Sequence, residues 1–177
     1  MKVKRGVYLV MGLMALCGIF SGRALAASTV TDTFQVQATV NAKCTVSAAD
    51  MTFATAYDGS LGAPNDSGQS NITVNCTKNA PYEVGLDAGV TAGATIATHL
   101  MKNTVNTDTM QYNLYTTAGR TTVWGNTQTV DTVTGTGNGL GVGQANTHTV
   151  YGRIPAGQTT LSVGTYQETT ITATVYY

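Results

Sequence analysis

The stretch FQVQATVNAKCTV, residues 34–46, alternates apolar and polar side chains without interruption. Its apolar positions all have even numbers; they are Phe34, Val36, Ala38, Val40, Ala42, Cys44 and Val46. Period-two alternation predicts an extended strand with one apolar face. At 13 residues, the run is about twice the usual length of a strand. It is therefore either one long strand that bends across a sandwich, or an extension over residues 27–40 followed by a separate strand near Cys44.

Shorter runs with the same period follow along the chain, and residues that favour helices are scarce. Strands are expected at residues 70–77, 82–86, 108–116, 121–124, 147–154 and 170–177. Turn sequences rich in Gly, Pro, Asn and Asp separate these runs. The chain is therefore predicted to be all-β, an immunoglobulin-like antiparallel β-sandwich. The glycine-rich segment 131–146 matches no phosphate-binding motif and is expected to be a flexible surface loop.

The first 26 residues have the layout of a secretory signal peptide. Basic residues precede an apolar run over residues 6–20, which is too short to span a bilayer, and an A-x-A cleavage site follows before Ala27. The chain is therefore expected to be exported through the inner membrane. Its mature part is expected to comprise an N-terminal extension, residues 27–41, and one β-sandwich domain, residues 42–177.

Two cysteines, Cys44 and Cys76, remain after the signal peptide is removed. Cysteines of exported proteins are usually oxidised, so these two are predicted to form a disulfide bond. A bridge that closes a loop of about 33 residues is expected to stabilise the fold by about 3–4 kcal/mol.

The mature chain has five basic and nine acidic residues, a formal net charge of −4, which argues against nucleic acid as a partner. Its acidic residues are scattered, and His99 and His148 are expected on the surface or on edge strands. No catalytic or metal-binding motif occurs, so we expect neither an enzyme nor a cofactor. A carbohydrate-binding sandwich is a competing hypothesis, because aromatic rings can stack on sugars. The candidate rings are Trp124, Tyr112, Tyr115 and Tyr151.

An apolar extension outside the disulfide-closed domain can bind in a groove on another molecule. Backbone hydrogen bonds to an open sheet edge would supply affinity, and every second side chain would fill a pocket. The candidate donor residues are Phe34, Val36, Ala38 and Val40. The domain that accepts them must lack one strand of its own, so the sandwich is expected to be incomplete. Because the contact is head-to-tail, it generates an open filament.

Several motifs, in order along the chain, resemble one known family. They are the alternating segment before Cys44, ITVNC (72–76), YEVGLDAG (82–89), MQYNLY (110–115), RTTVWG (120–125), YGRIPAGQ (151–158) and GTY (164–166). In this order they resemble the spore coat protein U domain family and, within it, the archaic chaperone–usher pilins of the Csu type. The resemblance covers essentially all of the mature chain.

The C-terminus resembles chaperone–usher pilins in a second respect. These proteins commonly carry a glycine fourteen residues from the end and a penultimate aromatic residue, and here Gly164 and Tyr176 stand at those positions. The resemblance implies that the last strand borders the groove, with groove residues Gly164, Ile171, Ala173, Val175, Tyr176 and Tyr177. It also implies three kinds of partner: a periplasmic chaperone, an outer-membrane usher and identical or related pilin subunits.

The function implied by the resemblance is that of a structural subunit of a surface fibre used for attachment and biofilm formation. The protein would pass through the periplasm and end in an extracellular fibre. A secreted carbohydrate-binding sandwich and a structural protein of a spore or outer coat are the alternatives.

Overall fold

The computed structural model describes residues 27–177, and the predicted signal peptide, residues 1–26, lies outside this range. The chain divides after Ala38 into two compact units. We call residues 27–41 the extension and residues 42–177 the body. No strand forms between residues 27 and 43, and the first strand, β1, begins at Cys44. The interpretation of residues 34–46 as one long strand is therefore wrong, and the alternation spans two separate elements.

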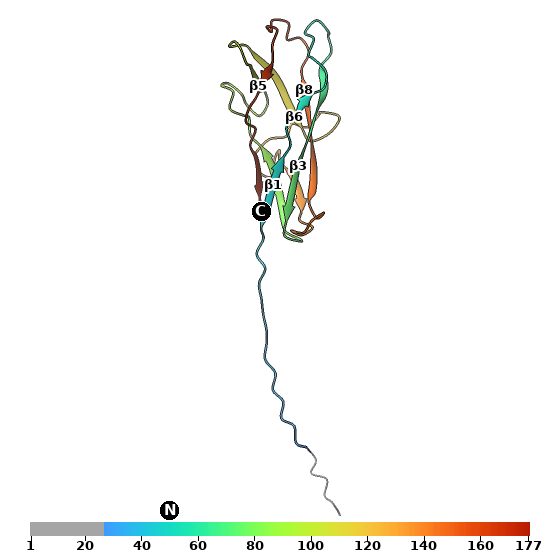
Figure 1. Ribbon diagram of the computed structural model, residues 1–177, viewed down its shortest axis with the longest axis vertical. Coiled ribbons are helices and arrows are strands. Elements are labelled where there is room, and N and C mark those ends of the chain that lie inside the picture. Colours follow the sequence, from blue (N-terminus) through green and yellow to red (C-terminus); the bar gives the residue numbers. More distant parts are fainter. Residues whose placement is uncertain (1–26) are drawn as a thin grey trace, which may run out of the picture. The chain divides into compact units, whose positions relative to one another are not determined.

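The body is built from two antiparallel sheets (Figure 1). The larger sheet has the order β1-β3-β8-β6-β5-β9, with β2 paired to β3, and the smaller sheet has the order β10-β4-β7. The strands of the larger sheet are β1 (Cys44–Ala48), β2 (Thr52–Phe53), β3 (Asn65–Cys76), β5 (His99–Asn103), β6 (Thr109–Tyr115), β8 (Asn146–Ile154) and β9 (Tyr166–Gln167). Those of the smaller sheet are β4 (Pro81–Leu86), β7 (Val133–Thr136) and β10 (Ala173–Tyr176). The predicted all-β antiparallel architecture is confirmed.

The core lies between the two sheets and follows the predicted alternation. In β3 the residues Ile72, Val74 and Cys76 are buried, and their neighbours in sequence are more exposed. The other buried hydrophobic residues are Ala80, Tyr82, Val84, Leu86, Met110, Tyr112, Leu114, Trp124, Val150 and Ile154. The predicted disulfide between Cys44 and Cys76 is confirmed, and the two residues stand directly opposite each other in the β1–β3 ladder.

Two local predictions are wrong. Residues 121–124 do not form a strand; they make an isolated bridge between Val123 and Tyr115. The segment 131–146 is not wholly a loop, because it contains β7, which pairs with β4. Gly135 lies in β7 opposite Tyr82, and a Cβ atom at this position would overlap the tyrosine ring. The tyrosine ring therefore requires a glycine at this position. In the sequence alone, the same glycine is typical of a flexible loop. Within residues 27–177 there is no helix long and apolar enough to cross a membrane.

Candidate functional site

The inward face of β1 is only partly covered by the opposite sheet. Cys44, Val46 and Ala48 stand directly opposite Cys76, Val74 and Ile72 of β3, so both sets of side chains point to the same face of the sheet. The β3 residues are buried, but Val46 is 41% exposed and Ala48 is also exposed. In a closed sandwich a strand of the other sheet would lie over them. The smaller sheet, whose strand β10 contacts β1, therefore leaves Val46 and Ala48 uncovered.

The strand at this border of the smaller sheet is β10, and one of its edges is free. The N–H of Asp87 donates to the carbonyl of Thr172 at 3.1 Å, so even-numbered residues of this segment turn their backbone groups toward β4. By the alternation of an antiparallel ladder, Ala173 and Val175 turn theirs to the other side. In the described part of the chain, no strand pairs with β10 on that side. These groups are available to a further strand.

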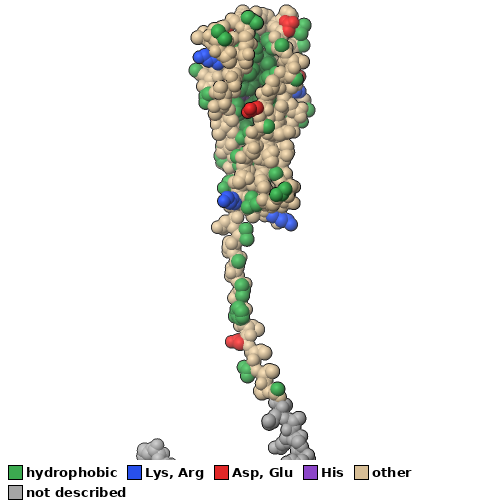
Figure 2. Space-filling model, viewed as in Figure 1, with side chains coloured by type: hydrophobic (Ala, Val, Ile, Leu, Met, Phe, Trp, Pro, Cys, Tyr) green, Lys and Arg blue, Asp and Glu red, His purple; other side chains and the backbone are tan. Residues whose placement is uncertain are grey.

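We call the space between β1 and the free edge of β10 the open seam. Figure 2 shows a hollow in the body with hydrophobic side chains on its floor, between the segment that runs from β1 to β2 and the segment that leads into β10. Both segments leave hydrophobic side chains partly exposed while they pack against the core. These side chains are Cys44, Met51, Phe53, Leu161, Tyr166, Ile171, Ala173 and Val175. The seam therefore exposes edges of the core itself.

The predicted groove residues fall on two different sheets. Ile171, Ala173 and Val175 pack against the core at β10, and the hydroxyl of Tyr176 lies 2.9 Å from Oδ1 of Asn126. Gly164, in contrast, lies just before β9, which pairs with β5 in the larger sheet. The C-terminal segment thus crosses from one sheet to the other between β9 and β10.

Two carboxylates fix this crossing, and sequence reasoning missed both. Oδ1 of Asp87 accepts hydrogen bonds from the N–H groups of Thr172 (2.8 Å) and Gly89 (3.1 Å). The carboxylate of Glu168 accepts from the N–H groups of Thr91 (2.8 Å) and Thr170 (3.0 Å). Burial acts to raise the pKa of each carboxyl group, but the hydrogen bonds outweigh it and hold each pKa below its ordinary value. The start of β10 is therefore held while its edge stays open.

The extension carries the predicted donor residues, and all of them are exposed. Phe34 is 88% exposed, Val36 82% and Val40 81%, and Ala38 is exposed as well. Large apolar side chains in a row are rarely left in water unless they bind a partner. The described part of the chain thus contains an uncovered apolar seam and, separately, an uncovered apolar strand sequence.

Comparison with known proteins identifies the family. A family model described as the Spore Coat Protein U domain matches residues 30–174. The chain belongs to the spore coat protein U domain family. Protein U of Myxococcus xanthus is 37% identical over 109 residues, an alignment that covers 59% of this chain and 57% of Protein U. The matched part is thus little more than half of that relative.

Solved structures resemble the fold of this spore coat protein U domain. One is the crystal structure of the CsuC–CsuE chaperone–tip adhesion subunit pre-assembly complex from archaic chaperone–usher Csu pili of Acinetobacter baumannii. It has a TM-score of 0.53 and 21% sequence identity, and covers 78% of this chain and 41% of that chain. At this identity the similarity establishes a common fold. The minor tip subunit HdaB of the E. coli Hda pilus is more distant, with a TM-score of 0.38, 12% identity, and coverage of 76% and 79%.

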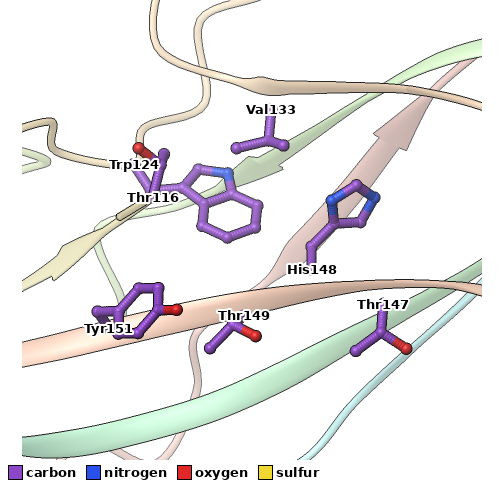
Figure 3. A pocket seen from close by; sticks show the side chains of 7 residues that line it. All are labelled: Thr116, Trp124, Val133, Thr147, His148, Thr149 and Tyr151. Carbon is purple, nitrogen blue, oxygen red and sulfur yellow. The ribbon is translucent and has the colours of Figure 1, made fainter. Parts of the chain in front are cut away.

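The stacking platform considered for a sugar ligand does not form in the spore coat protein U domain. Trp124 is 1% exposed, and its indole N–H donates to the carbonyl of Val84 at 2.8 Å. Tyr112 is buried, and the rings of Tyr115 and Tyr151 lie beside arginine guanidinium groups. A cavity of about 260 Å³ lies near Trp124, and the side chains around it come from β7, β8 and the region that follows β6 (Figure 3). The most favourable ring for stacking is therefore part of the core.

The expectation that the histidines lie on the surface or on edge strands is wrong for His99, which is buried, and His148 is half-buried on β8, an inner strand of the larger sheet. His99 is fully buried, and its Nε2 lies 3.1 Å from the carbonyl oxygen of Asp87. Nε2 of His148 lies 2.9 Å from the hydroxyl of Tyr82. Burial lowers the pKa of both imidazoles. Among residues 27–177, no cluster of three or more His, Cys, Asp or Glu side chains could hold a metal ion.

Gly164→Ala should destabilise the domain by about 2 kcal/mol, which corresponds to a fall in Tm of about 4–8 °C. Gly164 has a φ of +151°, and a Cβ atom there would lie 2.8 Å from Nδ2 of Asn103, which is 2% exposed. Because residue 164 is a glycine, the backbone that leads into β9 can pack directly against the buried side-chain amide of Asn103. Thermal unfolding followed by circular dichroism measures the shift. Gly119→Ala is the control, because no atom lies within 4 Å of the added methyl group, and Tm should stay unchanged.

Proposed function

We propose that the protein is a structural subunit of a chaperone–usher surface fibre and polymerises by donor-strand complementation. The observation that carries the proposal is the open seam, where Val46 and Ala48 on the inward face of β1 are exposed beside the free edge of β10. The extension of another copy would lie in this seam, pair with Ala173 and Val175 through its backbone, and cover Val46 with its side chains. Surface attachment and biofilm formation by the resulting fibre belong to the same proposal.

The energetics of this contact favour a long-lived fibre. Each apolar side chain of the extension that moves from water into the seam contributes about 1.5–3 kcal/mol, and alanine contributes less. The seam is covered at the same time, so apolar surface is removed from water on both molecules. Because the extension and the seam are different surfaces, each copy donates once and accepts once, and the chain of contacts does not close.

The proposal also requires other partners before assembly. An uncovered apolar seam beside an open strand edge is an aggregation hazard, so the subunit would need a periplasmic chaperone that occupies the seam until the next extension replaces it. An outer-membrane usher would then pass the subunits outward. The likeness in fold to the subunit of the Csu pre-assembly complex supports this assignment.

A synthetic peptide of residues 27–41 should bind the mature chain and raise its Tm by about 5–10 °C at a concentration 100-fold above Kd. The shift arises because the peptide binds the folded seam and not the unfolded chain. A peptide with Asp in place of both Phe34 and Val36 is the matched control and should cause no shift. If the unchanged peptide leaves Tm unaltered at millimolar concentration, donor-strand complementation is ruled out.

A further inference from the structure

The apolar face of the extension is interrupted at one position. Val30, Phe34, Val36, Ala38 and Val40 share even parity, and Asp32 stands among them on the same face. The Asp32 carboxylate accepts a hydrogen bond from the N–H of its neighbour Thr33 at 2.8 Å, and the residue is exposed. A strand that placed this whole face in an apolar seam would therefore bury a charge.

Alternation alone does not fix the register of such a strand. Because the side-chain period is two, a shift by two residues leaves apolar side chains facing the seam and keeps the backbone ladder intact. Withdrawing the extension from the seam by two residues would place Asp32 where Phe34 had been. A carboxylate in an apolar site costs several kcal/mol unless it is paired. The free energy of binding in this shifted register is therefore less favourable than in a register that places only apolar side chains in the seam.

One end of the body offers a favourable place for the carboxylate. The N–H of Thr77 donates to the carbonyl of Lys43 at 2.9 Å, and the N–H of Lys43 donates to Oγ1 of Thr77 at 3.0 Å. Lys78 follows in the next turn, and β10 ends beside the start of β4. We call this end the lysine pole; Figure 2 shows Lys or Arg side chains there. Within the described residues, the ion pairs are those that Asp66 makes with Arg120 and Arg153, so no carboxylate lies within 4 Å of either lysine.

The geometry of a head-to-tail contact brings Asp32 to the lysine pole. The extension leaves the body at this pole, just before Lys43, so in an open filament it enters the next copy at the opposite end. We propose a pairing in which Val40 lies beside Tyr166 of the accepting copy. A rise of about 3.3 Å per residue then places Asp32 about 26 Å further along, near residue 174 of β10. β10 contacts β1, whose first residue directly follows Lys43, so an Asp32 side chain at this place would lie near the lysine pole.

From these observations we infer that Asp32 sets the register of the donor strand by stopping at the lysine pole, where Lys43 of the accepting copy faces it. The inference rests on donor-strand complementation by the extension. Residues 34–40 lie in the seam, Asp32 marks the end of the buried part, and Val30 lies beyond it. The apolar residues alone would let the extension bind in several registers, and Asp32 selects one of them.

Competition binding with peptides of residues 27–41 on the mature chain tests the inference. Asp32→Lys should weaken binding about two- to five-fold, the range of a solvent-exposed ion pair. Lys43→Glu in the accepting chain should weaken binding of the unchanged peptide by the same factor, and pairing the two variants should restore it. Asp32→Asn keeps the shape and removes the charge, so its effect should be intermediate.

A crosslinking experiment reads the register itself. A Val36→Cys peptide is oxidised onto acceptors that carry Thr169→Cys or Ile171→Cys, and one of the two should crosslink strongly. Adding Asp32→Val to the peptide should let both acceptors crosslink. A single register with Asp32→Val, or equal binding of the Asp32→Lys peptide, would overturn the role of Asp32, while an unchanged Kd for Lys43→Glu would overturn its pairing with the pole. If the unchanged peptide does not bind at all, donor-strand complementation fails as well.

Discussion

Val36→Asp should abolish fibre growth while leaving the subunit folded. Val36 lies in the middle of the apolar face of the extension and is 82% exposed, so the substitution changes no packing within the described chain. In an assembled fibre the same residue would enter the seam, where an unpaired carboxylate costs several kcal/mol in addition to the lost burial of valine, about 1.5–3 kcal/mol. Together these losses correspond to at least a thousand-fold weaker contact. Electron microscopy of cells and size-exclusion chromatography of the exported protein measure the outcome.

The matched control is Gln37→Asp, which adds the same charge one residue away on the opposite face of the extension. Fibres of this variant should have normal length, because residue 37 points away from the seam. A thermal unfolding curve of each variant in complex with its chaperone separates assembly from folding. Fibres of normal length from the Val36→Asp variant would show that the extension is not the donor.

The sequence could predict which side chains of a strand face inward, as it does for residues 36 and 37. Parity along a strand is a local property, so the alternation of apolar and polar residues was enough to assign the inward sets of β3 and β6. The same reasoning could not tell where the alternating run 34–46 divides, because both parts have the same parity. The division at Cys44 depends on the pairing of β1 with β3, which is a contact between distant residues.

The alternation of apolar and polar residues does not predict the open seam. Val46 has the sequence environment of an ordinary inward-facing strand residue, and its exposure follows from the absence of a neighbouring strand over it in the described part of the chain. The local sequence around Val46 does not indicate whether another strand covers it. Asp87 and Glu168 are equally inconspicuous, because acidic residues next to glycine or threonine are common in turns. Their role at the start of β10 emerges only where two loops 81 residues apart in sequence meet.

Replacing both cysteines, Cys44→Ser with Cys76→Ser, should destabilise the free subunit by about 3–4 kcal/mol and lower its Tm by about 8–15 °C. The reason is partly the longer free loop in the unfolded chain, as for any disulfide. A second reason is specific to this fold. β1 is an edge strand whose residues after Cys44 are exposed, so it is held mainly by its ladder to β3 and by the bridge at its first residue, with little help from burial.

The second reason makes the size of the effect depend on assembly. Once a donor strand covers Val46 and pairs beside β10, burial holds β1 in place, so the loss of the bridge should lower Tm less in the peptide-bound subunit than in the free one. Differential scanning calorimetry with and without the peptide of residues 27–41 measures both values. Reduction of the unchanged protein should reproduce the effect and should not alter the double variant further. Equal losses in the two states would mean that the donor does not cover β1, and would place the bound strand elsewhere on the body.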